Sequence, residues 1–424
     1  MKTLFVKQKS SALFQVSQQT FWQLLGKAIT SLATFIILGM VTRAYGEAQT
    51  GVFTLALTYL AFFYLISDFG INAHIVPHLL HGPISAQWRR LLGLRITLSL
   101  ILFTIAATGV LIWPVDNLFR QAVLWGSLAI FGSSVYTTAA AIFQSKLRYD
   151  LSTLAVLVGT LVPLPLFYLF IASHQGIPYL MLVHLLGWLL LGATALISVK
   201  RYISSLLPVF DFSYIKKIIL EVWPITATLI LNTIYFRLDA FILSSLKSFS
   251  EVGVYNLSFS IFQSLLVVPT FIMNGYYPVM IKNFSQDKQK FVANLKKAAV
   301  LMLAVAALGT VFTLLLSPLV VNVLTGGQGF MGAEISLQIL SLSFPAFFVS
   351  SILMWTLVTI KKYKTMMIIY FLGLIFNLVL NLVFIPKYSF YAASAVTVMG
   401  EYLIVLLQVV VLIRVLAKQR TSFF

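Results

Sequence analysis

The sequence predicts an all-α polytopic membrane protein, with about twelve transmembrane helices arranged as two six-helix bundles around a central cavity. Of its 424 residues, 60% are hydrophobic and only 9% are charged, and its mean hydropathy of +0.97 lies far outside the range of soluble globular domains. Apolar windows of about 20 residues recur along the whole chain, and each can cross roughly 30 Å of hydrocarbon as a helix. Lysine and arginine are concentrated in every second loop.

The apolar windows define the predicted spans. In chain order they cover residues 17–42, 52–74, 92–112, 120–143, 151–172, 178–199, 218–245, 253–278, 293–323, 335–360, 365–385 and 389–413. Prolines inside several windows, including Pro163 in the fifth and Pro345 in the tenth, each remove a backbone hydrogen bond. We therefore expect these helices to bend at the prolines.

Lysine and arginine give the orientation. With the N-terminus inside, 23 of the 29 fall in inner segments, among them Arg95, and four fall in outer loops. The remaining two, Lys27 and Arg237, lie inside predicted spans. Because cytoplasmic loops carry the excess of positive residues, both termini are predicted to be cytoplasmic. The net charge of +18 is thus an orientation signal, and no nucleic acid partner is expected.

The connection at 199–217 divides the windows into two sets of six, which gives predicted domains 1–205 and 206–424. The sets are weakly similar, since TGVFTLALTYL at 50–60 resembles VGVYNLSFSIF at 252–262. Six spans return the chain to its starting side, so the two sets should be related by an axis along the membrane normal. That relation predicts a cavity between two bundles.

Several chemistries are disfavoured. The chain has no cysteine, which excludes disulfides, thiolate metal sites and cysteine nucleophiles. His74, His78 and His81 have helical metal-ligand spacing, but Pro77 interrupts them and no carboxylate is near, so an interfacial cluster is favoured over a metal site. The motif GGQGFMG at 326–332 has no strand before it, so it predicts a flexible outer loop rather than a dinucleotide site. No cofactor or metal is therefore expected.

Three stretches carry a family resemblance. They are LEVWPITATLILNTIYFRLDAFILSSLKSFSEVGVYNLSFSIFQSLLVVPTFIMNGYYPVM at 220–280, FNLVLNLVFIPKYSFYAASAVTVMGEYL at 376–403 and RAYGEAQTGVFTLALTYLAFFYLISDFGI at 43–71. All resemble bacterial oligosaccharide flippases of the polysaccharide transporter family, in the multidrug/oligosaccharidyl-lipid/polysaccharide exporter superfamily. Ser389-Phe390-Tyr391 departs from the family, which more often has glycine and small residues there, and this leaves the shape of that outer turn open.

The resemblance implies a function. Such proteins move an oligosaccharide repeat unit, for instance of O-antigen, on a polyprenyl diphosphate carrier from the cytoplasmic to the periplasmic leaflet by alternating access. The protein would then be a transporter and not an enzyme, in the bacterial inner membrane. Its partners would be the lipid-linked oligosaccharide, membrane lipids and polysaccharide polymerase machinery. A V-shaped, two-lobed cavity is also implied.

Charged residues within hydrocarbon are the candidate functional groups. A charge at the bilayer centre costs at least ~2.5 kcal/mol, so such residues usually face a bundle interior or an aqueous cavity. They are Lys27, Asp68, Glu221, Arg237, Asp239 and Glu401. Lys27 and Asp68 have similar predicted depths, and pairing would lower the cost of both; snorkelling of Lys27 and a structural helix-end role for Asp68 are the alternatives. Glu401, with Asp239, is the candidate H⁺ or Na⁺ coupling group.

Arg237 and Asp239 are only two residues apart but are not expected to pair, because two residues turn a helix by about 200°. Arg237 is predicted to face the cavity, since a guanidinium binds phosphate and sugar-acid oxygens in bidentate geometry. Asp239 would then be structural, and the reverse arrangement stays open. Lys27 and Arg237 would then present positive charges to the substrate at two depths in the cavity.

Neutral polar residues complete the predicted substrate site. Asn232 and Tyr235 share a helix face with Asp239, and Tyr235, like Tyr255 and Tyr276, could stack on sugars. Asn377, one turn from Asn381, could bond sugar hydroxyls, with helix–helix hydrogen bonding as the alternative. The predicted substrate-binding residues are Lys27, Arg237, Asn232, Tyr235 and Asn377.

Two other functions stay open beside the flippase. A multidrug or organic-cation antiporter of the same superfamily should carry acidic groups in its first half, whereas the first span carries Lys27. A membrane polysaccharide polymerase should have a large outer loop with clustered catalytic residues, and the outer loops here are short. The flippase is therefore the leading hypothesis.

Overall fold

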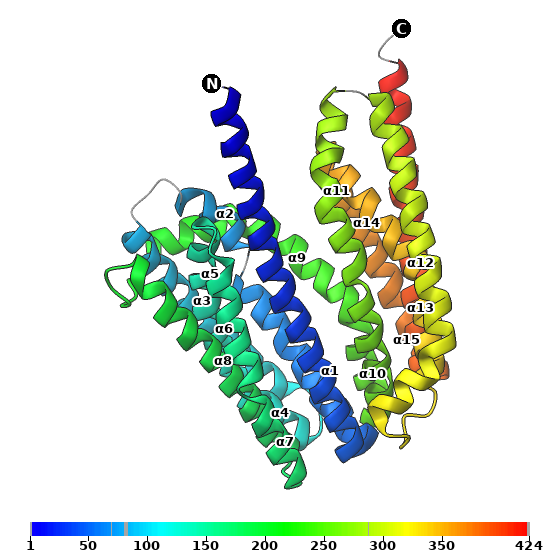
Figure 1. Cartoon of the computed structure of the whole chain (residues 1–424). Helices are drawn as coiled ribbons and strands as arrows, with labels where there is room; N and C mark the ends of the chain where they lie inside the picture. The colour runs from blue at the N-terminus through cyan, green and yellow to red at the C-terminus, as the bar shows by residue number, and fades with distance from the viewer. Residues whose placement is uncertain (1, 69, 80–83, 287, 422–424) are drawn as a thin grey trace. The chain divides into compact units, whose positions relative to one another are not determined.

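The computed structural model describes residues 2–68, 70–79, 84–286 and 288–421, and within these ranges the chain is helical throughout its elements, with no β-strand (Figure 1). The all-α fold class is confirmed. By length and composition, eight helices in the described ranges can cross a membrane, or up to nine if one bent pair of helices is a single span.

Ten helical elements cover the part of the chain up to residue 246. They are α1 (Lys2–Asp68), α2 (Ile71–Leu79), α3 (Ile84–Ile112), α4 (Asn117–Ser127), α5 (Ala129–Ser145), α6 (Tyr149–Leu161), α7 (Leu164–Ala172), α8 (Ile177–Val199), the 3-10 turn η1 (Lys200–Tyr202) and α9 (Phe212–Leu246). The later helices are α10 (Phe249–Leu265), α11 (Val267–Gln286), α12 (Lys288–Thr325), α13 (Ala333–Ser341), α14 (Phe344–Thr359) and α15 (Tyr363–Thr421).

The twelve predicted windows all coincide with helical segments. α15 contains two windows and breaks between them at Ser389 (φ 51°), while α1 contains the first window and most of the second, which continues into α2, and breaks at Gly46 (φ 68°). Four other windows are each built from two successive helices. Two of the prolines inside the windows coincide with a break between helices: α6 ends and α7 begins around Pro163, and α13 and α14 meet at 41° just before Pro345. Proline is tolerated there because the first turn of a helix has no internal N–H bond to lose.

The chain divides into two compact units. Unit 1 comprises Met1–Ala44 and Val52–Ile230, and unit 2 comprises Tyr45–Gly51 and Leu231–Phe424. α9 contributes to both, and its first turns bury apolar side chains in the core of unit 1. The predicted domain boundary at 205/206 lies in the linker before α9 and stays a prediction.

Small residues let the helices of unit 1 approach closely. A Cβ at Gly132 of α5 would lie 2.6 Å from the carbonyl oxygen of Trp188 on α8, and one at Gly159 of α6 would lie 2.7 Å from that of Gly187. In lipid, association depends on such close packing because burial from water does not drive it. α8 is therefore held against α5 and α6 backbone to backbone.

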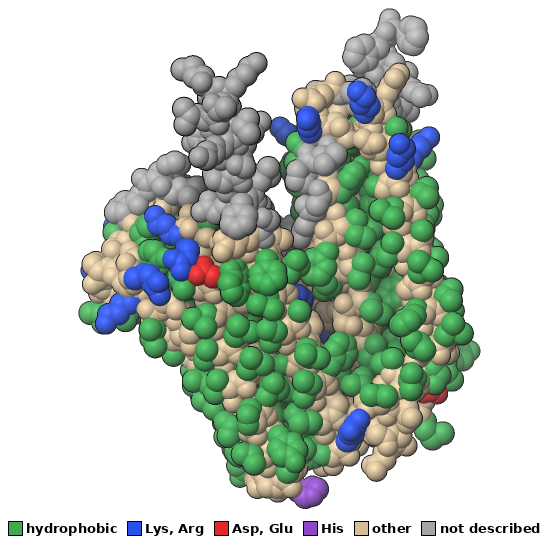
Figure 2. Space-filling model, viewed as in Figure 1, with side chains coloured by type: hydrophobic (Ala, Val, Ile, Leu, Met, Phe, Trp, Pro, Cys, Tyr) green, Lys and Arg blue, Asp and Glu red, His purple; other side chains and the backbone are tan. Residues whose placement is uncertain are grey.

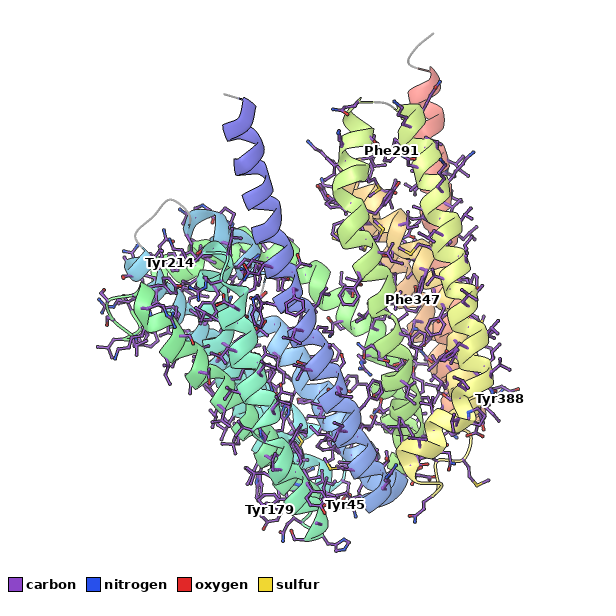
Figure 3. All side chains as sticks on the ribbon, in the orientation of Figure 1. Tyr45, Tyr179, Tyr214, Phe291, Phe347 and Tyr388 are labelled. Carbon is purple, nitrogen blue, oxygen red and sulfur yellow. The ribbon has the colours of Figure 1, made fainter. Side chains whose placement is uncertain are left out.

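Aromatic rings fill the core of unit 2. Phe347 of α14, labelled in Figure 3, stacks on Phe236 of α9 with ring centres 5.6 Å apart, and it meets Phe262 of α10 edge-on at the same separation. Phe344 stacks on Phe262 at 5.3 Å. These contacts join α9, α10 and α14, and they position the polar residues that follow on α9.

The outer surface suits hydrocarbon. On the face shown in Figure 2, hydrophobic side chains cover the sides of the helices, while Lys and Arg gather mostly toward one end of each unit. Leu308 and Leu315 on α12 are 71% and 73% exposed. A continuous apolar face of this kind is unfavourable in water and is expected of a multi-pass membrane protein.

Candidate functional site

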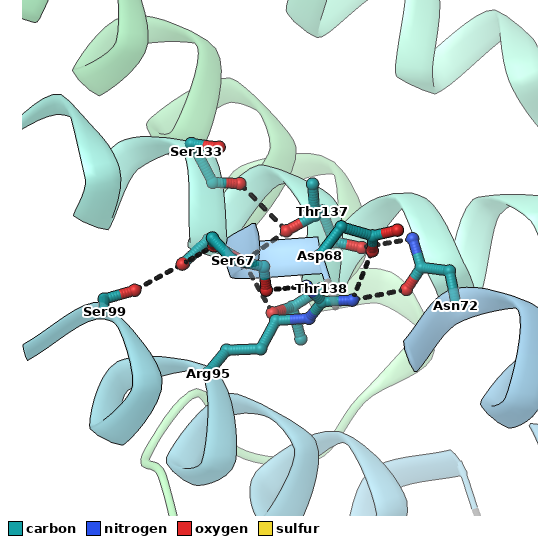
Figure 4. Close-up of polar contacts among 9 residues, drawn as sticks. Ser67, Asp68, Asn72, Arg95, Ser99, Ser133, Thr137 and Thr138 are labelled. Atoms are coloured by element: carbon teal, nitrogen blue, oxygen red, sulfur yellow. Dashed lines mark hydrogen bonds and ion pairs between the residues drawn. The ribbon is translucent and has the colours of Figure 1, made fainter. Parts of the chain in front are cut away.

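A buried ion pair lies in unit 1 (Figure 4). The side chain of Arg95 on α3 is fully buried, and its Nη2 donates to Asp68 Oδ1 at 2.9 Å and to Asn72 Oδ1 at 2.6 Å. Its Nη1 donates to the backbone oxygen of Ser67 at 2.8 Å. Because a guanidinium is an obligate cation with five donors, burial requires both a counter-charge and several acceptors. The end of α1 and the start of α2 supply them.

Neutral hydroxyls extend this network. The hydroxyl of Ser134 on α5 hydrogen-bonds those of Ser67 and Ser99, and all three residues are buried. Asn72 Nδ2 donates to the backbone oxygen of Thr137 at 3.2 Å. The network therefore fastens α3, α5 and the α1–α2 junction to one another, as Figure 4 shows.

The predicted pairing of Lys27 with Asp68 is wrong, because Arg95 is the partner of Asp68. Lys27 is exposed on α1. The view that Lys27 and Arg237 are the only intramembrane cations is also wrong, since Arg95 was grouped with the loop residues before the third span. α3 in fact begins at Ile84, so Arg95 lies well inside the helix and turns into the bundle.

The histidine cluster has a carboxylate neighbour, contrary to the prediction. Glu221 Oε2 on α9 lies 3.0 Å from His74 Nε2. The ring of His74 lies against that of His78, with centres 5.0 Å apart. His81 lies outside the described residues. The sequence did not show this pairing because Glu221 belongs to a distant span that folds back onto α2.

Two buried carboxyls lie in unit 2. Asp239 on α9 is 2% exposed and accepts hydrogen bonds from the Tyr255 hydroxyl of α10, from the Thr397 hydroxyl of α15 at 3.1 Å, and from the Ala240 N–H at 2.7 Å. Glu401 on α15 is also 2% exposed and accepts from the Tyr235 hydroxyl at 2.7 Å.

These two carboxyls differ from Asp68 in their partners. Within the described ranges, no lysine or arginine forms an ion pair with either of them. Hydroxyl and amide donors stabilise a buried carboxylate without cancelling its charge. A role for Asp239 and Glu401 in H⁺ or Na⁺ coupling stays a prediction.

Arg237 and Asp239 contact different residues, as their angular separation on the helix predicts. Nη2 of Arg237 donates to Gln263 Oε1 at 2.6 Å, and its guanidinium carbon lies 4.5 Å from the ring centre of Phe259. Arg237 is half-buried, whereas Asp239 is buried. The guanidinium thus has a neutral acceptor and an aromatic face, and among the described residues no carboxylate forms an ion pair with it.

Most of the predicted neutral substrate contacts face the protein in this conformation. Tyr235 and Asn377 are 3% and 2% exposed. Asn377 accepts from Asn381 Nδ2 at 2.7 Å, within one helix rather than between helices. Tyr255 is fully buried on Asp239, so it is not positioned to stack on a sugar. Asn232 is half-buried. Substrate contact by Tyr235, Asn377 and Asn232 stays a prediction.

The sequence of the chain matches two protein-family models. The model of the family described as "Polysaccharide biosynthesis protein" matches residues 16–284, more than half of the chain, and the model named MatE matches residues 224–383. None of the curated proteins matches the sequence.

Solved structures share the fold. The lipid II flippase MurJ in an inward closed conformation has a TM-score of 0.77 at 13% identity, covering 93% of this chain and 87% of that one. An inward-facing multidrug resistance MATE family transporter of the MOP superfamily has a TM-score of 0.73 at 13% identity, covering 92% and 96%. An outward-facing conformation of a transporter with the same description has a TM-score of 0.63 at 14% identity, covering 96% of each chain.

At these identities the structural likeness establishes the fold alone, which is the fold of flippases and transporters of the MOP superfamily. The family is established by the match over residues 16–284. This chain belongs to the polysaccharide biosynthesis protein family.

Proposed function

We propose that this protein flips a polyprenyl-diphosphate-linked oligosaccharide repeat unit from the cytoplasmic to the periplasmic leaflet by alternating access. The match to the polysaccharide biosynthesis protein family carries the proposal. The fold likeness to a lipid II flippase supports it, because that protein handles a lipid-linked substrate by its own name. The protein acts as a transporter and not as an enzyme.

The charges of the chain suit an anionic lipid carrier. Lys27 is exposed on α1, and Arg237 is half-buried beside a neutral Gln263. Because Gln263 is a neutral acceptor and does not cancel the positive charge of Arg237, a diphosphate oxygen can replace it as the acceptor. These two residues are the proposed cationic contacts of the diphosphate.

Replacing these cations tests the contact. Export of polymer should fall by about tenfold in Arg237→Ala and in Lys27→Ala, since each loses one charge-assisted contact worth about 1.5 to 3 kcal/mol. Gln263→Ala is the matched control, because it frees Arg237 without removing its charge. Polymer outside the cell is quantified against the amount of each variant in the membrane. Normal export by both alanine variants contradicts the role.

The coupling ion and the membrane location complete the proposed function. Coupling to H⁺ or Na⁺ is assigned to Glu401 and Asp239, whose neutral surroundings suit ion exchange. The protein lies in the bacterial inner membrane with both termini cytoplasmic, and it delivers repeat units to a polysaccharide polymerase. The concentration of lysine and arginine in the inner segments supports this orientation.

Multidrug antiport is the second candidate, and the MatE match at 224–383 favours it. An organic-cation antiporter of this superfamily is expected to present a free carboxylate in its first half. In unit 1 the carboxylate of Asp68 is already paired with Arg95. This pairing supports the flippase over the antiporter.

The experiment is to delete the gene and locate the lipid-linked repeat units. The flippase predicts that they accumulate on the inner leaflet and that polymer is lost. Repeat units found outside but unpolymerised indicate a polymerase instead. Unchanged polymer together with sensitivity to cationic dyes indicates the antiporter.

A further inference from the structure

α15 is a helical hairpin within unit 2. The chain breaks at Ser389, and the two halves pack side by side, since a Cβ at Gly373 in the first half would lie 3.2 Å from the side chain of Ile404 in the second. Gly373 precedes the break by 16 residues and Ile404 follows it by 15, so the halves run antiparallel. Lys364 and Arg414 each lie 25 residues from the break. They therefore share the end of the hairpin opposite Ser389.

An apolar groove, here called the α15 groove, runs between the two halves. It has a volume of 410 Å³, in the size range of small-molecule sites, and its lining residues are all leucine, isoleucine, valine or phenylalanine. Leu372, Ile375 and Val379 line it from the first half, and Leu403 and Leu407 line it from the second. The first three are 46%, 42% and 51% exposed, so the groove opens outward from the hairpin. A hydrocarbon chain is the ligand that such a lining suits.

The α15 groove lies on the face of the hairpin turned away from the core of unit 2. Glu401 marks the core side, because it is buried and accepts a hydrogen bond from Tyr235 of α9. Leu403 follows Glu401 by two residues, and two residues turn a helix by about 200°. What fills the groove therefore comes from outside unit 2, and around a multi-pass membrane protein the available hydrocarbon is lipid.

Two cations lie on the same helix face as the groove, toward the end of the hairpin opposite the break. Lys364 precedes Ile375 by eleven residues, and Arg414 follows Leu407 by seven. These spacings are close to three and two full helical turns, so each cation lies in line with the groove. Both are exposed, and within the described ranges neither forms an ion pair. Their charges are thus available to a ligand in the groove.

The spacing between the cations and the groove matches one lipid molecule. With a rise of 1.5 Å per residue, Leu407 and Leu403 lie about 10 and 16 Å from Arg414 along the helix axis. One leaflet, from the headgroups to the bilayer centre, is roughly 20 Å deep. A lipid whose phosphate lies at Arg414 therefore places its chain beside both leucines. Lys361 and Lys362, exposed at the same end of the hairpin, add positive charge around the headgroup.

We propose that the α15 groove binds one anionic phospholipid of the bilayer, with an acyl chain in the groove and the phosphate between Lys364 and Arg414. The apolar lining selects a hydrocarbon chain, and the two cations select a negative headgroup. A zwitterionic headgroup carries a cation of its own, so it gains less from the same site. The charge pattern predicts that this end of the hairpin is cytoplasmic, which assigns the lipid to the inner leaflet. Binding of this lipid does not depend on the transport function proposed above.

Lipid binding by the purified full-length chain tests the site. Dioleoyl phosphatidylglycerol is titrated into the protein in detergent, and bound lipid is counted by native mass spectrometry. It should bind about tenfold more tightly than phosphatidylcholine with the same chains. Lys364→Gln combined with Arg414→Gln should weaken its binding by about thirtyfold, since each cation near a membrane surface contributes about fivefold. Lys296→Gln combined with Lys297→Gln, on exposed residues of α12, removes the same charge and should leave binding unchanged.

The apolar part of the site is tested separately. Ile375→Trp places a bulky ring in the groove at a residue that is already 42% exposed, so it should block the acyl chain without disturbing the core. Binding of phosphatidylglycerol should fall by about tenfold. Leu315→Trp on α12, at a residue that is 73% exposed, is the matched control and should bind the lipid as the unchanged chain does. Equal unfolding temperatures in the absence of lipid show that the variants are folded.

The proposal is overturned if the unchanged chain binds phosphatidylcholine as tightly as phosphatidylglycerol, or if the α15 double variant keeps full affinity. A polyprenyl diphosphate that displaces phosphatidylglycerol from the groove, with the same losses in the variants, assigns the groove to the carrier lipid and also overturns the proposal. Because transport is not measured, the fate of polymer after deletion of the gene bears on the flippase function alone.

Discussion

The two units keep buried charge in opposite ways. Unit 1 pairs the buried Arg95 with Asp68 at 2.9 Å and adds amide and carbonyl acceptors around the guanidinium. Unit 2 buries Asp239 and Glu401 among tyrosine and threonine hydroxyls. One arrangement contains its own counter-charge, and the other depends on neutral donors.

This difference suits the two sites to different roles, one to holding helices together and the other to binding and releasing an ion. A matched ion pair has no net charge to gain or lose, so the Arg95 network is suited to fastening helices. A carboxyl surrounded by neutral donors changes its charge whenever it takes up a proton or a cation. We therefore expect unit 1 to respond to mutation mainly in stability, and unit 2 mainly in transport.

The largest effect should come from breaking the pair in unit 1. Arg95→Leu leaves Asp68 without its cation and is expected to destabilise the protein by about 3 to 5 kcal/mol. Arg90→Leu is the control, because its pair with Asp211 is longer, at 3.4 Å, and more exposed; it should cost no more than about 1 kcal/mol. Thermal unfolding in detergent compares them. Equal losses would show that burial of Arg95 carries no special weight.

The next largest effect is expected on transport, in unit 2, without loss of fold. Asp239→Asn and Glu401→Gln keep an acceptor for their hydroxyl partners but cannot carry charge, so export should fall by about tenfold or more while the unfolding temperature changes little. Glu221→Gln, on an exposed carboxyl, should leave export unchanged. If both amide variants export normally, these carboxyls are structural, and the contrast between the units disappears.

The sequence predicted the helices but not the pairing among them. The twelve windows followed from hydropathy alone, because a membrane span is a local property. The separation of Arg237 from Asp239 followed from helix geometry, since both lie on one helix. The break at Ser389 was left open, and the structure resolves it: the Ser389 hydroxyl bonds Glu251 of α10 while the residue takes positive φ.

The sequence did not predict the contacts between spans that are distant along the chain. Tyr235 and Glu401 are 166 residues apart, and helix periodicity does not say which faces meet. Arg95 was missed although it lies inside the apolar window 92–112, because it follows two loop arginines. A single cation within an apolar window was the available signal. Asp68, a carboxylate in the preceding predicted span, was the available candidate for the partner of Arg95.

The smallest effect is expected from removing the hydrogen bond between Tyr235 and Glu401. Tyr235→Phe removes the one hydroxyl that contacts Glu401 in the described structure and should destabilise the protein by about 1 kcal/mol. Because Glu401 would keep its charge chemistry, export should fall much less than in Glu401→Gln. Tyr402→Phe, whose hydroxyl bonds a backbone oxygen at an exposed site, is the control. A larger export defect in Tyr235→Phe than in Glu401→Gln would place the transport role on the tyrosine.

Translocation by the purified protein in liposomes tests the flippase function directly. A fluorescent polyprenyl-diphosphate oligosaccharide is incorporated on both leaflets, and the fraction open to an external quencher is followed with time. The protected pool should become accessible with the unchanged chain and much more slowly with Arg237→Ala. Equal rates with empty liposomes, together with uptake of an organic cation by the same vesicles, would contradict the flippase function.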